Sequence, residues 1–433
     1  MTKAIVKIWD TEIGVLTLAD GDDFASFEYL PDFLKSGIEL APFTMTLSKR
    51  VFRFPSLQKD TFKGLPGAFS DSLPDKFGNK VINAWLESLG RRPNSMNAVE
   101  RLCYTGKRGM GAFEYEPALA DQSARESEMI ELNELARLSN EVLSSRSQFS
   151  TVISSTEKSE LLRLVQVGSS AGGARAKALV AWNRETGEMK SGQIDAGKGF
   201  EYYLVKFDGV SSNGDHDFTD SEGFCNIEYA YHLMAKAVGI DMMESFLFEE
   251  GGRFHFMTKR FDRASDGSKI HMLTLGGMRH FDFNDPGSNS YEQVAETIIN
   301  LGLGKGSLEQ LYRRMCFNVV ARNQDDHVKN VSFLMDRNGE WSLSPAYDLT
   351  FSYRPDSIWV GQHQMTMNGK QRGFSLDDFK AAGASMLIKP HRAKEILEQV
   401  ELGVKGFKEY AIKARVPEQT CNVIQSQFEY FLL

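Results

Sequence analysis

Residues 325–348 read DDHVKNVSFLMDRNGEWSLSPAYD, and this stretch decides the predicted fold of the chain. Two runs rich in alternating apolar residues flank the pair Asn338-Gly339, and Asn-Gly between such runs is the strongest short-range signal of a β-hairpin. The hairpin would fold the chain back on itself. We therefore expect Asp348 to return towards Asn330.

An Asp followed five positions later by an Asn and, after a hairpin, by a second Asp is typical of protein kinases. Phosphoryl transfer needs Mg²⁺ on the phosphates and a carboxylate that orients and deprotonates the acceptor hydroxyl. Asp325 is then the predicted catalytic base. Asn330 and Asp348 are the predicted Mg²⁺ ligands, since Mg²⁺ prefers oxygen donors. Each residue alone is better explained by turn chemistry. Only their order around the hairpin favours a kinase.

The flanking sequence predicts helices on both sides of this stretch. SLEQLYRRMCFNVVARNQ has helical periodicity from a Ser307 cap, and from residue 285 onward the chain is mainly helical. Ser375 and Asp378 resemble a capping box. Further helical patterns are SYEQVAETIINLGLG, SLDDFKAAG, residues 393–400 and EQTCNVIQSQFEYFLL.

A nucleotide-binding region is expected upstream. GSSAGGARAKALVAW, residues 168–182, is a run of small residues entering an apolar strand, and its backbone NH groups could approach phosphates, although a surface turn explains it equally well. In EYYLVKFD, Lys206 interrupts a buried-strand pattern and predicts a phosphate ligand, or else a solvent-facing lysine. Glu228, early in the helical CNIEYAYHLMAKAVG, is its expected partner, or else serves the helix dipole.

These motifs together resemble the HipA family of bacterial toxin serine/threonine kinases along nearly the whole chain. The resemblance is carried by GSSAGGARAKA, EYYLVKFD, NIEYAYHLMAKAVGI, KRFDR, ARNQDDHVKNVSFL and SPAYDL, with FPSLQKDTFKGLPGAFSDSLPDKFG similar to the amino-terminal subdomain of the family. It implies an α+β fold. The expected architecture is a bilobed protein-kinase-like fold with a mainly helical C-terminal lobe, plus a small N-terminal α/β subdomain.

The resemblance also implies roles for individual residues. Asp325 would be the catalytic base, and Asn330 and Asp348 the Mg²⁺ ligands. Residues implied to bind ATP are Gly172, Gly173, Ala174, Arg175, Ala176 and Lys177 of the phosphate loop, Lys206, the adenine-binding connection Lys259, Arg260 and Phe261, and His327, Lys329 and Tyr347. Ser170 occupies the place of a serine whose autophosphorylation ejects the phosphate loop, with Ser169 as the alternative.

The chain departs from the family pattern at two positions. Lys259 stands where the prototype toxin has an acidic residue, so the main chain would have to make the adenine contacts. Asp326 follows the predicted base where the prototype has Gly. The spacing to Asn330 favours Asp325 as the base, and Asp326 is expected to cap the preceding helix or to bind the loop.

The implied domains are residues 1–117, an N-terminal HipA-type subdomain; residues 128–262, a linker helix and the kinase N-lobe with the phosphate loop; and residues 263–433, the helical kinase C-lobe with the catalytic loop. Residues 117–128 form a polar linker, and AIVKIW, GVLTLA and FASFEYL before it predict strands of a small sheet. KFGNKVINAWLESLG predicts a helix ended by Gly90.

Composition sets further limits. The 433 residues exceed one comfortable core, and no apolar run approaches about 18 residues, so we expect a cytoplasmic chain without a membrane role. Four dispersed cysteines predict reduced, structural thiols. The net charge of −8 argues against direct binding of a phosphate backbone. The resemblance implies a helix-turn-helix antitoxin (HipB-like) that would carry any contact with operator DNA.

The predicted function is ATP- and Mg²⁺-dependent phosphorylation of a protein serine or threonine by the toxin of a type II toxin–antitoxin module. The resemblance points to an aminoacyl-tRNA synthetase as the target, and hence to blocked translation. Two alternatives stay open: a small-molecule kinase with the same catalytic loop, and a catalytically silent corepressor scaffold that binds an antitoxin.

Overall fold

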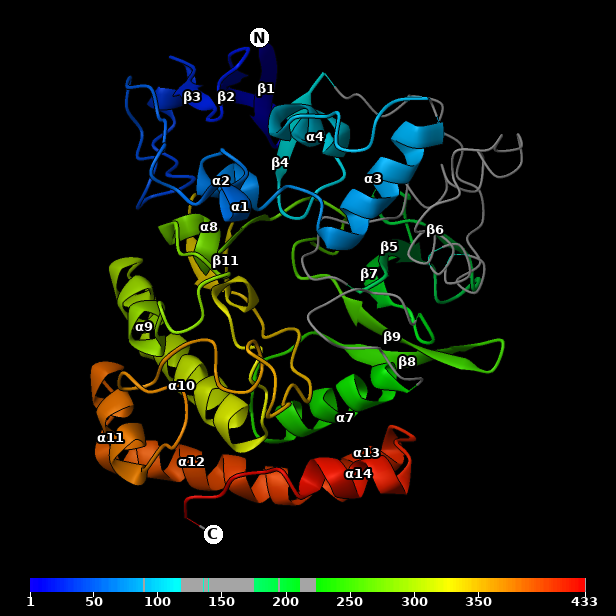
Figure 1. The fold of residues 1–433 in the computed structure, drawn as a ribbon, viewed down its shortest axis with the longest axis vertical. Helices are drawn as coiled ribbons and strands as arrows, with labels where there is room; N and C mark the ends of the chain where they lie inside the picture. The colour runs from blue at the N-terminus through cyan, green and yellow to red at the C-terminus, as the bar shows by residue number, and fades with distance from the viewer. Residues whose placement is uncertain are drawn as a thin grey trace.

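The computed structural model describes residues 1–88, 90–117, 135, 139, 175–193, 195–210 and 223–432. They form a mixed α/β fold with the N-terminal sheet at one end and the last helices of the chain at the other (Figure 1). The middle of the molecule holds a second sheet and the predicted hairpin. The predicted site residues that the structure describes come from this middle part.

The N-terminal sheet has four antiparallel strands in the order β3-β2-β1-β4. Its strands are β1 (Thr2–Ile8), β2 (Thr11–Leu18), β3 (Ser26–Tyr29) and β4 (Phe113–Glu116). Ala4, Val6 and Ile8 alternate inward along β1 and are fully buried, as expected of a sheet with one covered face. The three strands predicted before residue 31 are thereby confirmed.

Short helices connect β3 with β4. They are η1 (Phe33–Lys35), α1 (Lys59–Phe62), α2 (Gly67–Ser70), α3 (Lys76–Ser88) and α4 (Ala98–Thr105). The predicted helix before Gly90 is confirmed as α3, and Gly90 has a positive φ of 71° that suits a glycine. Phe77, Val81 and Ile82 of α3 belong to the core of the next sheet, so this N-terminal helix is packed against the middle of the molecule.

The middle sheet is antiparallel, in the order β6-β5-β7-β9-β8. Its elements are β5 (Lys177–Trp182), β6 (Met189–Ser191), β7 (Glu201–Lys206), β8 (Ser245–Glu250) and β9 (Arg253–Lys259), with α7 (Phe224–Ala237) between β7 and β8. The predictions of a strand that ends near Lys206 and of a helix that contains Glu228 are confirmed.

The predicted hairpin is present in a three-stranded sheet of order β10-β11-β12. Its strands are β10 (His271–Thr274), β11 (Ser332–Met335) and β12 (Trp341–Leu343), and Phe333 pairs with Leu343 across the antiparallel hairpin. Gly339 in the turn has a φ of 86°, which only glycine adopts without strain. The Asn-Gly pair therefore turns the chain where the sequence predicted.

Helices are the main regular element of the remaining chain. They are α8 (Leu275–Arg279), α9 (Tyr291–Asn300), α10 (Lys305–Val320), η3 (Val328–Asn330), α11 (Leu376–Ser385), α12 (Pro390–Lys405), α13 (Phe407–Lys413) and α14 (Glu418–Gln425). The capping box of Ser375 and Asp378 is confirmed. The expected cap at Ser307 is wrong: α10 begins two residues earlier, because extended Gly304 is itself an adequate N-cap.

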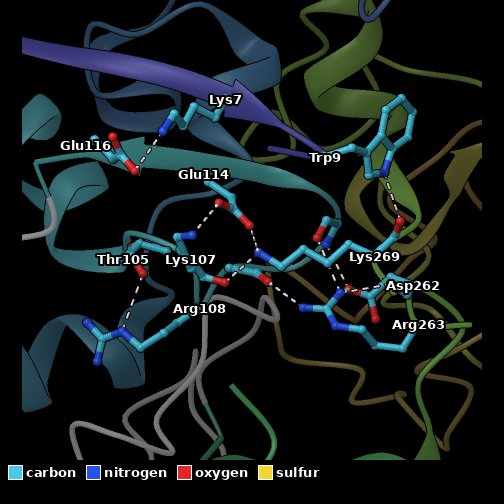
Figure 2. Close-up of polar contacts among 12 residues, drawn as sticks. Lys7, Trp9, Thr105, Lys107, Arg108, Glu114, Glu116, Asp262, Arg263 and Lys269 are labelled. Atoms are coloured by element: carbon cyan, nitrogen blue, oxygen red, sulfur yellow. Dashed lines mark hydrogen bonds and ion pairs between the residues drawn. The ribbon is translucent and has the colours of Figure 1, made fainter. Parts of the chain in front are cut away.

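Buried polar contacts join the N-terminal sheet to the segment between β9 and β10 (Figure 2). The backbone NH of Gly111 donates to the Asp262 carboxylate at 2.7 Å, and Lys269 Nζ lies 2.8 Å from Glu114 Oε1. Trp9 Nε1 donates to the Lys269 carbonyl at 2.8 Å. Burial lowers the pKa of Lys269 to about 8, although the nearby Glu114 carboxylate opposes this shift.

The cysteines agree with the prediction of structural thiols. Cys103, Cys225, Cys316 and Cys421 are all buried free thiols. Among the helices that the structure describes, each is too short or too polar to cross a bilayer.

Gly277 in α8 provides a test of how closely the N-terminal region is packed. A Cβ at this position would lie 2.1 Å from Asp71 Oδ2 and 3.0 Å from the Gly67 carbonyl oxygen. We expect Gly277→Ala to lower the free energy of unfolding by about 2 kcal/mol, because this packing leaves no room for a methyl group. Urea unfolding followed by circular dichroism measures the change.

Gly306→Ala is the matched control, because nothing lies within 4 Å of its added Cβ in α10. That variant should unfold at the same or a slightly higher urea concentration, since alanine favours the helix. Equal midpoints for the two variants would contradict the close contact of α2 with α8.

Candidate active site

The hairpin brings the predicted metal ligands to one place. Tyr347, the residue before Asp348, donates its hydroxyl to the Lys329 carbonyl at 2.6 Å, which holds the end of the hairpin against η3. The Asn330 side-chain nitrogen donates to the Asp325 carbonyl at 2.9 Å. This bond turns the Asn330 amide oxygen away from that carbonyl. Asp325, Asn330 and Asp348 thus belong to one connected unit.

Lys206 is buried at the end of β7 between two carboxylates. Its Nζ lies 2.6 Å from Glu228 Oε1 of α7 and also makes an ion pair with Asp348. Burial alone would lower the pKa of Lys206, but Asp348 and Glu228 reverse this and raise it above the usual lysine range. Lys206 is therefore a charged ammonium group. The prediction that it points inward and pairs with Glu228 is confirmed.

Asp348 is held in its charged form and in an unusual backbone conformation. Burial would raise its pKa, but Lys206, Lys177 and Arg175 together hold the pKa well below the usual range of a carboxyl. Its φ of 57° lies in the left-handed region, which an aspartate occupies only when its surroundings impose it. Such strain is common where a side chain must be aimed at a ligand.

The donor set at this place fits a magnesium ion. Asp348 supplies a carboxylate and Asn330 a side-chain amide oxygen, both of them hard oxygen donors. Mg²⁺ is usually held by one or two such protein ligands together with the phosphates of a nucleotide. The charged state of Asp348 also suits a cation ligand. These two residues would hold the ion.

Asp325 and Asp326 have different surroundings. The Asp325 side chain is 42% exposed; its Oδ1 accepts from Gln364 Nε2 at 2.8 Å and lies 3.8 Å from His327 Nε2. Asp326 is buried and accepts hydrogen bonds from three groups of other segments. The structure therefore leaves Asp325 as the aspartate that can meet a reactant. Asp326 binds Tyr291 of α9 and residues 363 and 364, whereas the sequence left open a cap on the preceding helix or a contact with the loop.

The phosphate loop is described only in part. Gly172, Gly173, Ala174, Ser169 and Ser170 lie outside the described residues. Arg175 places its guanidinium 3.2 Å from the centre of the Phe224 ring, at the start of α7, and Ala176 is buried. Lys177 begins β5, with its Nζ 3.4 Å from Asp75 Oδ2 in a buried ion pair.

Two aspartates of the N-terminal region reach this charged cluster. Asp75 pairs with Lys177, and Asp71 accepts from the Thr274 NH at 2.8 Å and from its hydroxyl at 2.9 Å. Burial raises the pKa of both carboxylates, and the positive charge of Lys329 opposes this shift at each of them. The predictions from sequence missed both residues, although two aspartates in the largely apolar AFSDSLPDKF were a usable signal.

The three residues of the predicted adenine-binding connection contact different parts of the structure. Lys259 pairs with Glu201, and its backbone NH donates to the Glu244 carbonyl at 2.9 Å. Arg260 is buried. Its guanidinium forms an ion pair with Asp262, and its backbone NH donates to the Tyr202 carbonyl. Phe261 alone of the three lies against another predicted site residue, with its ring centre 5.5 Å from that of Tyr347.

The side chains of His327 and Lys329 lie on one aromatic residue. The His327 ring centre is 5.8 Å from that of Phe283, and Lys329 Nζ is 4.7 Å from the same ring. Cation–π contact holds such a lysine without neutralising it. Both residues therefore flank the base and the metal ligands at the same loop.

Asp75→Asn tests the buried pair between the N-terminal region and β5. The amide still accepts the hydrogen bond that Asp75 receives from the Gly78 NH, but it leaves the buried Lys177 without its carboxylate partner. We expect a loss of about 3 kcal/mol in the free energy of unfolding, measured by urea denaturation at pH 7.

Asp23→Asn is the control, because Asp23 pairs with Lys59 at the exposed surface. Exposed pairs contribute at most about 1 kcal/mol, so the midpoint should scarcely change. A similar small effect for Asp75→Asn would mean that the buried pair does not hold the two regions together.

Two family models and a curated relative match this chain. The model of the HipA N-terminal domain matches residues 4–116, and that of the HipA-like C-terminal domain matches residues 169–406. A Haemophilus influenzae protein named "Putative kinase" is 26% identical over 159 residues, which are 33% of this chain and 46% of that protein. The match thus spans about half of that relative's length.

The fold also has a close counterpart among solved structures. HipA of Shewanella oneidensis MR-1, solved in a complex with HipB and its operator DNA, superposes with a TM-score of 0.67 at 15% identity. The superposition covers 98% of this chain and 94% of that one. At this identity the likeness concerns the fold.

Proposed function

The chain belongs to the HipA family, and on this premise we propose that it is an ATP- and Mg²⁺-dependent serine/threonine-protein kinase, the toxin of a type II toxin–antitoxin module. One observation carries the proposal. Asp325, Asn330 and Asp348 meet at one loop and hairpin, and Asp348 is ion-paired with Lys206, which also binds Glu228. This is the arrangement that phosphoryl transfer requires.

The proposed roles follow from the contacts. Mg²⁺·ATP, when bound, supplies the phosphoryl group and the cation that offsets its charge. Asn330 and Asp348 hold the cation, and Asp325 accepts the proton of the acceptor hydroxyl. As that proton leaves, the hydroxyl oxygen forms its bond to the γ-phosphorus, the bond from phosphorus to the bridging oxygen breaks, and ADP departs. Asp325 later releases the proton to solvent.

Positive groups around Asp348 support the nucleotide site. Lys206, Lys177 and Arg175 all act on its pKa, so their charges lie close together. Such a group of cations can neutralise phosphate oxygens. We assign the phosphates to these residues, with Lys206 as their direct ligand and the loop of Gly172 to Lys177 around them. His327 and Lys329 would complete the site.

The adenine would lie against the connection of Lys259 to Phe261. Two of the three backbone NH groups already donate within the sheet, so Phe261 and the neighbouring Tyr347 ring are the groups best placed to contact a base. Aromatic rings supply apolar area with little loss of side-chain freedom.

Partner and target are proposed from the family. The related HipA was solved with HipB and operator DNA, and we propose that a helix-turn-helix antitoxin likewise binds this chain. With a net charge of −8, contact with DNA would run through that antitoxin. We propose an aminoacyl-tRNA synthetase as the phosphorylated protein, so that blocked charging would stop translation and growth.

The direct test is transfer of label from γ-labelled ATP in the presence of Mg²⁺ and a cell lysate. A labelled protein band supports a protein kinase, whereas label only in a metabolite would replace it with a small-molecule kinase. No transfer at all would leave the scaffold role. Phosphoproteomics after brief expression then names the target.

Asp325→Asn separates catalysis from nucleotide binding. We expect transfer to fall by roughly 100-fold or more, because an amide cannot accept the hydroxyl proton, while affinity for a non-hydrolysable ATP analogue measured by calorimetry stays the same. Asp348→Asn should instead weaken Mg²⁺-dependent binding of the analogue by about tenfold or more, or roughly 1.4 kcal/mol.

Asp356→Asn is the control for both variants, because Asp356 is an exposed aspartate of the following loop. It should leave transfer and binding unchanged. Full transfer by Asp325→Asn would rule out its role as the base.

Ser170→Ala tests self-inactivation. Phosphate on Ser170 would bring up to about two negative charges to a loop built for ATP phosphates. The variant should keep kinase activity and lose most of the phosphate that the chain attaches to itself, as measured by mass spectrometry, with Ser169→Ala as the matched control. Unchanged phosphate in Ser170→Ala, or its loss only in Ser169→Ala, would contradict the assignment.

A further inference from the structure

The residue after the proposed base is a buried anchor. Asp326 is 2% exposed, and its Oδ2 accepts from Tyr291 of α9 at 2.7 Å and lies 2.8 Å from His363 Nδ1. Its Oδ1 accepts from the backbone NH of Gln364 at 2.7 Å. Burial would raise the pKa of Asp326, but His363 and these hydrogen bonds lower it. A charged carboxylate thus ties residues 363 and 364 to the catalytic loop.

Gln364 is thereby held at both ends. Its backbone NH donates to Asp326, while its side-chain Nε2 donates to Oδ1 of Asp325, the neighbouring aspartate, at 2.8 Å. The side chain is buried, unlike that of Asp325. One residue therefore bridges the anchor and the proposed base.

Further hydrogen bonds surround this bridge. Asn318 of α10 donates to the Tyr291 hydroxyl at 2.9 Å, and Asn323 donates to Asn318 at 2.9 Å. The backbone NH of His363 donates to the Gln371 carbonyl at 3.0 Å. Because each partner is bonded to a further group, Asp326 and Gln364 cannot move without breaking several buried hydrogen bonds.

We propose that Gln364 is a positioning residue for phosphoryl transfer, whose side-chain amide fixes the Asp325 carboxylate so that its second oxygen faces the acceptor hydroxyl. This inference rests on the proposed function. Asp326 and His363 set the place of Gln364, and Gln364 sets the rotation of Asp325. Asp326 stands where the prototype toxin of the family has Gly, and this proposal gives it a structural role in this chain.

The hydrogen bond from Gln364 should affect the pH at which the Asp325 carboxylate takes up a proton. An NH donor stabilises the charged form of a carboxylate, and a second carboxylate at the same distance would destabilise it. The ionisable groups placed around Asp325 include His327 of η3 on one side and Asp326 on the other, with His363 and Tyr291 behind Asp326. Replacing the amide of Gln364 by a carboxylate changes only the group in direct contact.

Gln364→Glu is the main variant. We expect the acidic limb of the pH–rate profile for protein-bound label, measured with the full chain, saturating Mg²⁺·ATP and lysate acceptors, to move up by about one pH unit or more. Affinity for the non-hydrolysable ATP analogue should stay within about twofold, since the base contacts the acceptor. A purely structural role would lower the rate at every pH without moving the limb.

Gln362→Glu is the matched control, because Gln362 lies in the same segment but bonds to Gln371 rather than to Asp325. Its limb should coincide with that of the wild type. Gln364→Met is the second variant; it keeps the volume and removes the donor, and it should lower kcat about tenfold with the KM for ATP unchanged. Thermal melting of each variant shows whether it is folded.

Outcomes separate the two proposals. An active wild type with an unshifted limb in Gln364→Glu, or with full kcat in Gln364→Met, overturns the role of Gln364 and leaves the kinase intact. If Gln364→Glu does not fold, Gln364→Met decides alone. A wild type that labels no protein overturns the proposed function, and the positioning role with it.

Discussion

The ammonium group of Lys206, buried between Glu228 and Asp348, is the interaction on which the rest of the site depends. It joins a strand of the middle sheet, the helix that follows it and the end of the hairpin. A buried charge is stable only when it is paired, so the Lys206 ammonium on β7 holds both carboxylates, and with them α7 and the end of the hairpin. The left-handed backbone of Asp348 is the local strain that this arrangement sustains.

The N-terminal region is part of the same electrostatic system. Asp75 pairs with Lys177 at the start of β5, and Asp71 binds the first turn of α8. A third connection runs from Gly111 and Glu114 to Asp262 and Lys269. The region therefore contacts the chain both before Lys206 and between Lys206 and the catalytic loop.

Sequence predicted those parts of the site that depend on neighbouring residues. The Asn338-Gly339 hairpin is local, and its return brings Tyr347, the residue before Asp348, to the carbonyl of Lys329, the residue before Asn330. Lys206 was recognisable because a charge interrupts an apolar strand. Gln364 was not, because it lies in an irregular loop and acquires its contact with Asp325 only through Asp326. The Asp75–Lys177 pair likewise joins segments that are far apart in the sequence, and no periodic pattern predicts that they are in contact.

Packing of α3 against the middle sheet has a consequence for dividing the molecule. Phe77, Val81 and Ile82 cover strands β5, β7 and β9, although they precede the boundary at which the C-terminal family match begins. A polypeptide starting at residue 169 would expose that apolar surface. It would also lack Asp75, the carboxylate that pairs with the buried Lys177. Exposed apolar surface of this kind favours aggregation, so we expect the two regions that the family models match to fold together.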